Sequence, residues 1–207
     1  QLVKSLTWVD DAITGNKLDL LKQAINITTI TGEGATGAGS IAGVQRADYG
    51  RVTEVGDLVE LLLKPSHHRE QGTQEEQDLL IRAGPGTGKT WSIRQLALKL
   101  AHKLLETTAA EPVPLVPLLI TVQRLAVLLR GGARPSDGDL LRFYIEHEYS
   151  GDEQKLLLQA YELRALVPLI DGIDEGADLK ERIEEFVVKK LAPAGLRVVL
   201  TSRPEGV

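Results

Sequence analysis

A glycine-rich turn between an apolar run and a helical pattern most constrains how this chain folds. The segment reads Asp78-Leu-Leu-Ile-Arg-Ala-Gly-Pro-Gly-Thr-Gly-Lys-Thr-Trp91. Its apolar part, Leu79–Ile81, has the length and composition of a buried strand. Beyond the turn, apolar residues recur at three- and four-residue spacing, at Ile93, Leu96, Ala97 and Leu100. The segment therefore predicts a strand, a tight glycine turn and a helix in direct succession.

This succession is the arrangement of a phosphate-binding loop. Glycines let successive backbone N–H groups point at one anion, and the helix that starts near Lys89 adds the positive end of its dipole. We expect Lys89 to reach the β- and γ-phosphates and the Thr90 hydroxyl to ligate Mg²⁺. The expected nucleotide-contacting residues are Gly84, Pro85, Gly86, Thr87, Gly88, Lys89, Thr90 and Trp91. Ala83 departs from the usual pattern, which opens with glycine, and the alternative is an ordinary Gly-Pro turn.

A second apolar run, 166–170, ends in the acidic sequence Asp171-Gly-Ile-Asp-Glu175. The carboxyl ends of parallel strands meet at one edge of a sheet, where ligands bind. Asp171 is therefore expected to hold Mg²⁺, directly or through water. Glu175, or alternatively Asp174, is expected to act as general base on the attacking water. The alternative is an Asp- and Gly-rich turn after a core strand.

A third apolar run, 196–201, is followed by Ser202-Arg203-Pro204. If this strand is parallel to the other two, Arg203 arrives at the same edge and can reach the γ-phosphate. A surface arginine before a proline is the alternative.

The remaining pattern alternates strands with helical segments, which predicts a parallel sheet covered on both faces. A further strand is expected at 113–121, at the sheet edge because of Pro117. Pro168 is compatible with an internal strand only at its start or at a bulge. Helices are expected within 1–30, at 57–64 with Asp57 as N-cap, and at 90–105, 125–129, 139–149, 153–165 and 178–191.

The composition of the chain limits the classes of partner and the cellular compartment that we expect for this protein. Over 207 residues, 29 acidic side chains against 24 basic ones leave a net charge of −5, which does not favour a nucleic-acid surface. The sequence has no cysteine, which excludes disulfides and cysteine metal sites and fits a reducing compartment, so we expect a cytoplasmic protein. No apolar run is long enough to span a membrane. The chain begins with Gln1 and contains no methionine, which suggests a piece of a longer protein.

Taken together, the three motifs resemble those of the NACHT family, within the STAND class of signalling P-loop NTPases. The resemblance covers about residues 50–207 and rests on Ala83-Gly-Pro-Gly-Thr-Gly-Lys-Thr90, Leu169-Ile-Asp-Gly-Ile-Asp-Glu175 and Leu200-Thr-Ser-Arg-Pro204. The first motif is generic to P-loop proteins, whereas the other two are more specific to NACHT proteins. The segment from Val116 to Leu125 is also similar to the family's second strand and the residues directly after that strand.

The resemblance implies a three-layer αβα core with a mostly parallel sheet, spanning 49–207 after a helical or linker segment at 1–48. It implies that Asp171 serves magnesium, that Asp174 and Glu175 position or activate water, and that Arg203 senses the γ-phosphate. The remaining core strand, the helical lid and the winged-helix subdomain of the family would lie beyond Val207.

From these motifs we expect Mg-dependent binding and slow hydrolysis of ATP or GTP. The resemblance alone adds a signalling switch that associates with itself or with other domains. The alternative is a degenerate nucleotide-binding interaction module without turnover. A metabolic kinase would need an acceptor pocket, which nothing in the sequence suggests.

Overall fold

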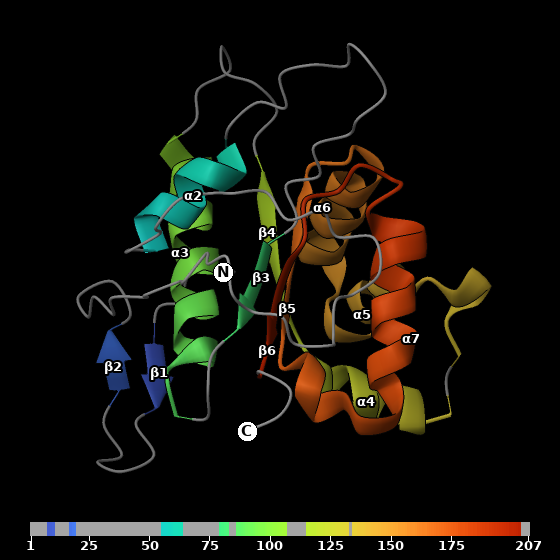
Figure 1. Ribbon diagram of the computed structural model, residues 1–207. Helices are drawn as coiled ribbons and strands as arrows, with labels where there is room; N and C mark the ends of the chain where they lie inside the picture. The colour runs from blue at the N-terminus through green and yellow to red at the C-terminus, as the bar shows by residue number, and fades with distance from the viewer. Residues whose placement is uncertain are drawn as a thin grey trace, which may run out of the picture.

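The protein is a mixed α/β fold built on a four-stranded parallel sheet (Figure 1). The computed structural model describes residues 8–10, 17–19, 55–63, 79–82, 86–106, 115–132 and 134–203. Across the sheet the strands are β3 (Leu79–Arg82), β6 (Val199–Ser202), β5 (Leu166–Asp171) and β4 (Val116–Thr121). All the pairings in this sheet are parallel, so the predicted parallel sheet is confirmed.

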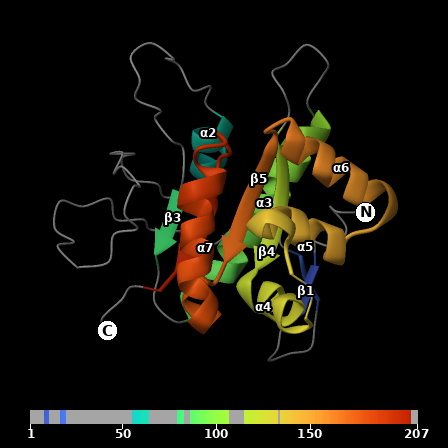
Figure 2. The ribbon, with the colours of Figure 1, turned by 90° about the vertical axis from the view of Figure 1, so that its right-hand side faces the viewer.

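Helices cover both faces of the sheet, as Figures 1 and 2 show. One face carries α2 (Val55–Leu63) and α3 (Lys89–Glu106). The other carries α4 (Val122–Arg130), α5 (Leu140–Glu148), α6 (Gly151–Glu162) and α7 (Lys180–Phe186). Three short helices accompany this second layer: η1 (Ser136–Gly138), η2 (Ile173–Leu179) and the π-helix η3 (Val187–Leu191).

Strand β5 shows why both faces are covered, because each of its residues is buried. Successive side chains of a strand point to opposite faces. Val167 and Leu169 accordingly pack with α2 and α3, whereas Leu166 and Ile170 pack with the helices of the other layer. A strand buried on both faces has a continuous apolar run instead of an alternating one, which is what the sequence shows.

The two prolines in strands lie where the ladder tolerates them. Pro117 belongs to β4, which has a strand neighbour on one side only within the described sheet, so its predicted edge position is confirmed. Pro168 faces Leu118 of β4, but the pairing of β5 with β6 begins one residue later, at Leu169. Pro168 therefore precedes the part of β5 that is paired on both sides.

The N-terminal prediction of helix is wrong for the residues that the structure describes there. β1 (Trp8–Asp10) and β2 (Lys17–Asp19) form an antiparallel pair in which Val9 faces Leu18. Val9 and Leu18 thus belong to paired strands, and the sequence Gly15-Asn16 between the strands is typical of a turn. The rest of the helical or linker segment expected at 1–48 lies outside the described residues.

Several helix boundaries also differ from prediction, among them those at α2 and α7. Helix α2 begins at Val55, so Asp57 lies inside the first turn and is not the N-cap. The helix expected at 178–191 is divided into the end of η2, α7 and η3. Its predicted inward residues, Leu179, Ile183, Phe186 and Val187, are nevertheless all buried.

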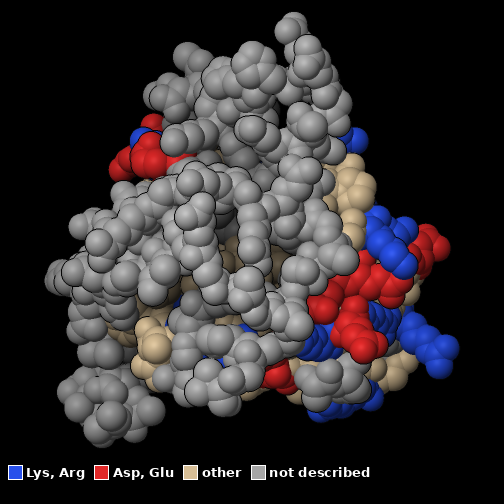
Figure 3. Space-filling model, viewed as in Figure 1, with Lys and Arg blue, Asp and Glu red and all other residues tan. Residues whose placement is uncertain are grey.

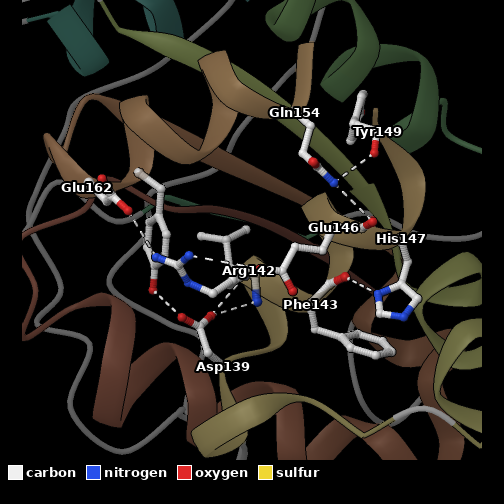
Figure 4. A network of polar contacts seen from close by, with 10 residues as sticks. Asp139, Arg142, Phe143, Glu146, His147, Tyr149, Gln154 and Glu162 are labelled. Atoms are coloured by element: carbon white, nitrogen blue, oxygen red, sulfur yellow. Dashed lines mark hydrogen bonds and ion pairs between the residues drawn. The ribbon is translucent and has the colours of Figure 1, made fainter. Parts of the chain in front are cut away.

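Polar contacts join α5 to α6 at the side of this layer (Figure 4). Asp139 caps α5 by accepting hydrogen bonds from the backbone N–H groups of Leu141 and Arg142, and its Oδ2 accepts one from the Tyr161 hydroxyl at 3.2 Å. Arg142 Nη2 lies 3.2 Å from Glu162 Oε1. These contacts stabilise the packing of α5 against α6 in the second helical layer.

Charges on the described surface are mixed in sign. In the view of Figure 3, acidic and basic side chains lie side by side over α7 and η3, where Lys189 pairs with Glu185. This intermixing is consistent with the net charge of −5 and gives the visible described surface there no extended basic area. Among the described helices, none is both long and apolar enough to cross a membrane.

Candidate functional site

Two glycines in the described part of the predicted phosphate-binding loop have a left-handed backbone. Gly86 and Gly88 have φ angles of 72° and 85°, a region that other residues rarely adopt. The Gly88 carbonyl accepts the first bond of α3, from the Ser92 N–H at 2.8 Å. Lys89 is therefore the first residue of an 18-residue helix whose first turn contains no acidic side chain. Gly84 and Pro85 lie outside the described residues.

The backbone N–H groups of that first helical turn point along the helix axis toward its N-terminal end. An anion is stabilised at such a position both by these donors and by the helix dipole. Thr87, Lys89 and Thr90 are partly or well exposed here. The indole Nε1 of Trp91 is buried and lacks a hydrogen-bond partner among the described residues.

Asp171 ends β5 and is 8% exposed, which makes it one of the few buried charged residues described. Its Oδ1 accepts a hydrogen bond from the Thr201 hydroxyl at 2.6 Å. The same hydroxyl oxygen accepts from the Gly172 backbone N–H at 2.9 Å, and Thr201 is completely buried. A carboxylate that accepts a buried hydrogen bond is held in one orientation, so Thr201 of β6 fixes the acid at the end of β5.

Arg203 lies just beyond β6 and contacts the two acids that follow Asp171. Its Nε is 2.9 Å from Asp174 Oδ2, and its backbone N–H donates to Asp174 Oδ1 at 3.0 Å. Its Nη2 is 3.6 Å from Glu175 Oε1. The Arg203 side chain remains half exposed, at 50%. The predicted site residues Asp174, Glu175 and Arg203 are thus brought together at one edge of the sheet.

Glu175 is held from two further directions. Its backbone N–H donates to the Gly172 carbonyl at 2.9 Å, and its Oε2 accepts from Gln123 Nε2 at 2.9 Å. The carboxylate folds back over Gly172, and its Oε2 lies 3.1 Å from where a Cβ would stand at that residue. Gly172 also has a φ of 81°, so a side chain there would be both strained and crowded.

Parallel strand direction explains why these residues converge. Arg82 pairs with Ser202 and Thr121 pairs with Asp171, so the strands end nearly level with one another. The segments after β3, β4, β5 and β6 consequently all start at the same edge, as predicted. These segments carry the glycine loop, Gln123, the acidic turn and Arg203 respectively.

Oxygen donors are the ligands that Mg²⁺ prefers, and Asp171 with Thr90 would supply a carboxylate and a hydroxyl. From the described residues, only Thr201 donates a hydrogen bond to the Asp171 carboxylate, through Oδ1. No group of three or more His, Cys, Asp or Glu residues within the described part could hold a metal by itself. The donor set thus fits an ion that completes its coordination with phosphate oxygens and water, not an ion held in a protein cage.

Two residues of this site were not identified as such from the sequence. Thr201 had a weak signal, as a polar residue near the end of an otherwise apolar strand. Gln123 had none, because its partner Glu175 is 52 residues away and only the β4–β5 pairing brings the two together.

Comparisons with protein-family models, with curated proteins and with solved structures found no match to this chain.

Proposed function

We propose that this protein binds ATP or GTP with Mg²⁺ at the carboxyl edge of the sheet and hydrolyses it slowly. The observation that carries the proposal is the convergence there of a glycine loop opening a helix, a buried aspartate and an arginine paired with two acids. Nucleotide hydrolysis needs a phosphate cradle, a metal ligand, a base and a cation for the γ-phosphate.

Each role falls to a residue whose position suits it. Lys89 and the loop amides would hold the phosphates, with Asp171 and Thr90 as ligands of Mg²⁺. Bound magnesium would neutralise charge that develops on the phosphate oxygens. Glu175 would orient and deprotonate the attacking water, with Asp174 as the alternative base. Arg203 would contact the γ-phosphate.

The ion pairs of Arg203 favour a switch over a simple enzyme. Arg203 forms ion pairs with Asp174 and Glu175. A γ-phosphate would compete with these carboxylates for the same guanidinium, and a nucleoside diphosphate would not. Such a difference between ATP and ADP states is what a NACHT-type P-loop protein of the STAND class would use to control assembly. We propose this larger role, together with a cytoplasmic location, on the strength of the resemblance in the sequence.

The same ion pairs also support a second candidate, a module that binds nucleotide without turnover. A carboxylate oxygen that is engaged by a guanidinium is not available to orient water, so Glu175 would be inactive for as long as Arg203 stays in place.

Calorimetric titration of the 207-residue chain with ATP and GTP in the presence of Mg²⁺ tests the proposal, with phosphate release measured in parallel. Lys89→Ala removes a charge-assisted contact worth about 1.5–3 kcal/mol, so nucleotide affinity should fall about tenfold to a hundredfold. Lys99→Ala is the matched control, because it makes the same change at an exposed position of α3 about 15 Å further along the helix.

Equal affinities of the parent and Lys89→Ala would exclude the phosphate role of the loop. Binding that depends on Lys89 but shows no phosphate release would favour the module without turnover.

A further inference from the structure

Three residues that were not predicted as site residues from the sequence lie around Glu175: Gln123, Gly172 and Gly176. Gln123 is the second residue of α4, the helix that follows the edge strand β4 directly. Its Nε2 donates to Glu175 Oε2 at 2.9 Å. This hydrogen bond is made to the oxygen opposite the one that Arg203 approaches, because Arg203 Nη2 faces Oε1.

The start of α4 is fixed independently of this hydrogen bond. Val122, the first residue of the helix, is completely buried and belongs to the core. Its Cγ1 lies 2.9 Å from where a Cβ would stand at Gly176, the residue after Glu175. A side chain at residue 176 would therefore push α4 and η2 apart. The glycine permits the close approach that brings the amide of Gln123 against Glu175.

The two contacts of the Glu175 carboxylate, with Arg203 and with Gln123, differ in whether they can persist during a reaction. Arg203 neutralises Glu175, and in the proposed function it must leave to contact the γ-phosphate. Gln123 is uncharged and is anchored through Val122, so it can keep its hydrogen bond throughout. One carboxylate oxygen then remains held while the other becomes available to a water molecule.

We propose that Gln123 is a positioning residue for Glu175, keeping the carboxylate directed when Arg203 moves to the phosphate. The proposal rests on the proposed function, since Glu175 needs orientation only if it activates water. Gln123 itself contacts neither nucleotide nor water in this role and acts through Glu175.

The test compares Gln123→Leu, which removes the amide at similar volume, with the parent chain. Single-turnover hydrolysis of ATP should slow about three- to tenfold, the effect of one ordinary hydrogen bond. The dissociation constant for Mg-ATP should stay unchanged. Gln159→Leu makes the same chemical change at an exposed position of α6 and should leave both quantities at the parent value. A Gln123→Leu variant that weakens ATP binding as much as it slows turnover would overturn the proposal.

A double-mutant cycle separates positioning from a general structural effect. Glu175→Asp withdraws the carboxylate by one methylene and breaks the contact with Gln123 while retaining a base. In that background Gln123→Leu should cause no further loss of rate. A full three- to tenfold loss in both backgrounds would show that Gln123 acts independently of Glu175.

A third measurement needs no turnover. In nuclear magnetic resonance spectra of the nucleotide-free chain, the Gln123 side-chain amide is identified by its absence in Gln123→Leu. Its signals should shift in Glu175→Ala and stay in place in Glu185→Ala, an exposed acid of α7. Unshifted signals in Glu175→Ala would overturn the proposal while leaving the proposed function intact. A parent chain without any turnover would instead overturn the hydrolytic function, and the positioning role of Gln123 in hydrolysis with it.

Discussion

Arg203 and Asp174 contact each other twice, once through a side chain and once through the backbone. Arg203 Nε lies 2.9 Å from Asp174 Oδ2, and the Arg203 N–H donates to Asp174 Oδ1 at 3.0 Å. The backbone bond ties the segment after β6 to the acidic turn after β5, and it can persist when the guanidinium turns away. The pair therefore combines a fixed anchor with a cation that can be displaced.

Replacing Arg203 should lower the affinity for a nucleoside triphosphate more than the affinity for a diphosphate. Arg203→Ala should weaken a non-hydrolysable ATP analogue by about 1.5–3 kcal/mol and ADP by much less, because ADP lacks the γ-phosphate. Arg203→Lys should recover only part of the loss, since an ammonium lacks the planar fork. The measurement is the ratio of the two affinities in each variant. If both affinities fall equally, or neither changes, Arg203 is a surface arginine that serves only its acidic partners.

Substitution of Glu175 or Asp174 should lower the rate of hydrolysis without a comparable loss of nucleotide affinity. Glu175→Gln preserves shape but removes the basic carboxylate, so hydrolysis should fall by a factor on the order of 10²–10⁴ while Mg-ATP binding changes little. Asp174→Asn should affect turnover less, because Asp174 is occupied by Arg203 through both of its oxygens. Phosphate release and calorimetry on both variants provide the comparison. The opposite ranking would assign the base to Asp174.

The buried hydroxyl of Thr201 should stabilise the fold and support magnesium binding together. Thr201→Val keeps the volume but leaves Asp171 Oδ1 and the Gly172 N–H without a partner, which should lower the free energy of unfolding by about 1–3 kcal/mol. Thr201→Ser retains the hydroxyl and should recover most of this loss. Urea unfolding measures the stability.

Calorimetry at several Mg²⁺ concentrations tests the second effect of the same substitutions. Both Thr201→Val and Asp171→Asn should weaken the magnesium dependence of nucleotide binding. A Thr201→Val variant with parental stability would contradict the buried hydrogen bonds.

Tyr161 should make the fold sensitive to alkali. Burial, and secondarily the neighbouring Asp139 carboxylate, raise the pKa of Tyr161 from 10.0 to about 12. The unfolded chain then loses this proton at lower pH than the folded chain. The stabilisation is complete below pH 10 and is lost as pH rises toward about 12.

Tyr161→Phe cannot titrate, so its free energy of unfolding should decline less steeply above pH 10 than that of the parent. Near pH 8 the variant should be less stable by about 0.5–1.5 kcal/mol, because it lacks the hydrogen bond to Asp139. Urea unfolding at about pH 8 and about pH 11.5, on either side of the ordinary tyrosine pKa, measures both effects. A constant difference between the two chains at these pH values would show that Tyr161 does not contribute to the alkaline loss.

Local patterns in the sequence determined the elements of the core and the residues at the sheet edge. The apolar run before Asp171 is a strand buried on both faces, and the periodicity after Lys89 is one long helix, because burial and helical geometry act over a few residues. The arrival of Arg203 at the same sheet edge as Asp174 and Glu175 also followed from sequence, since parallel strands deliver their carboxyl ends to one edge. Short segments with few apolar residues were misjudged, as at Val9 and Leu18.

Only the tertiary structure decided which partner each acidic residue takes. Asp171 is bonded to Thr201, Asp174 to Arg203 and Glu175 to Gln123, across separations of 30, 29 and 52 residues. Such pairings depend on strand order and register, and on the close approach that Gly176 permits against Val122. A hydrogen bond needs its two atoms placed within a few tenths of an ångström, and no local preference of the chain contains that information.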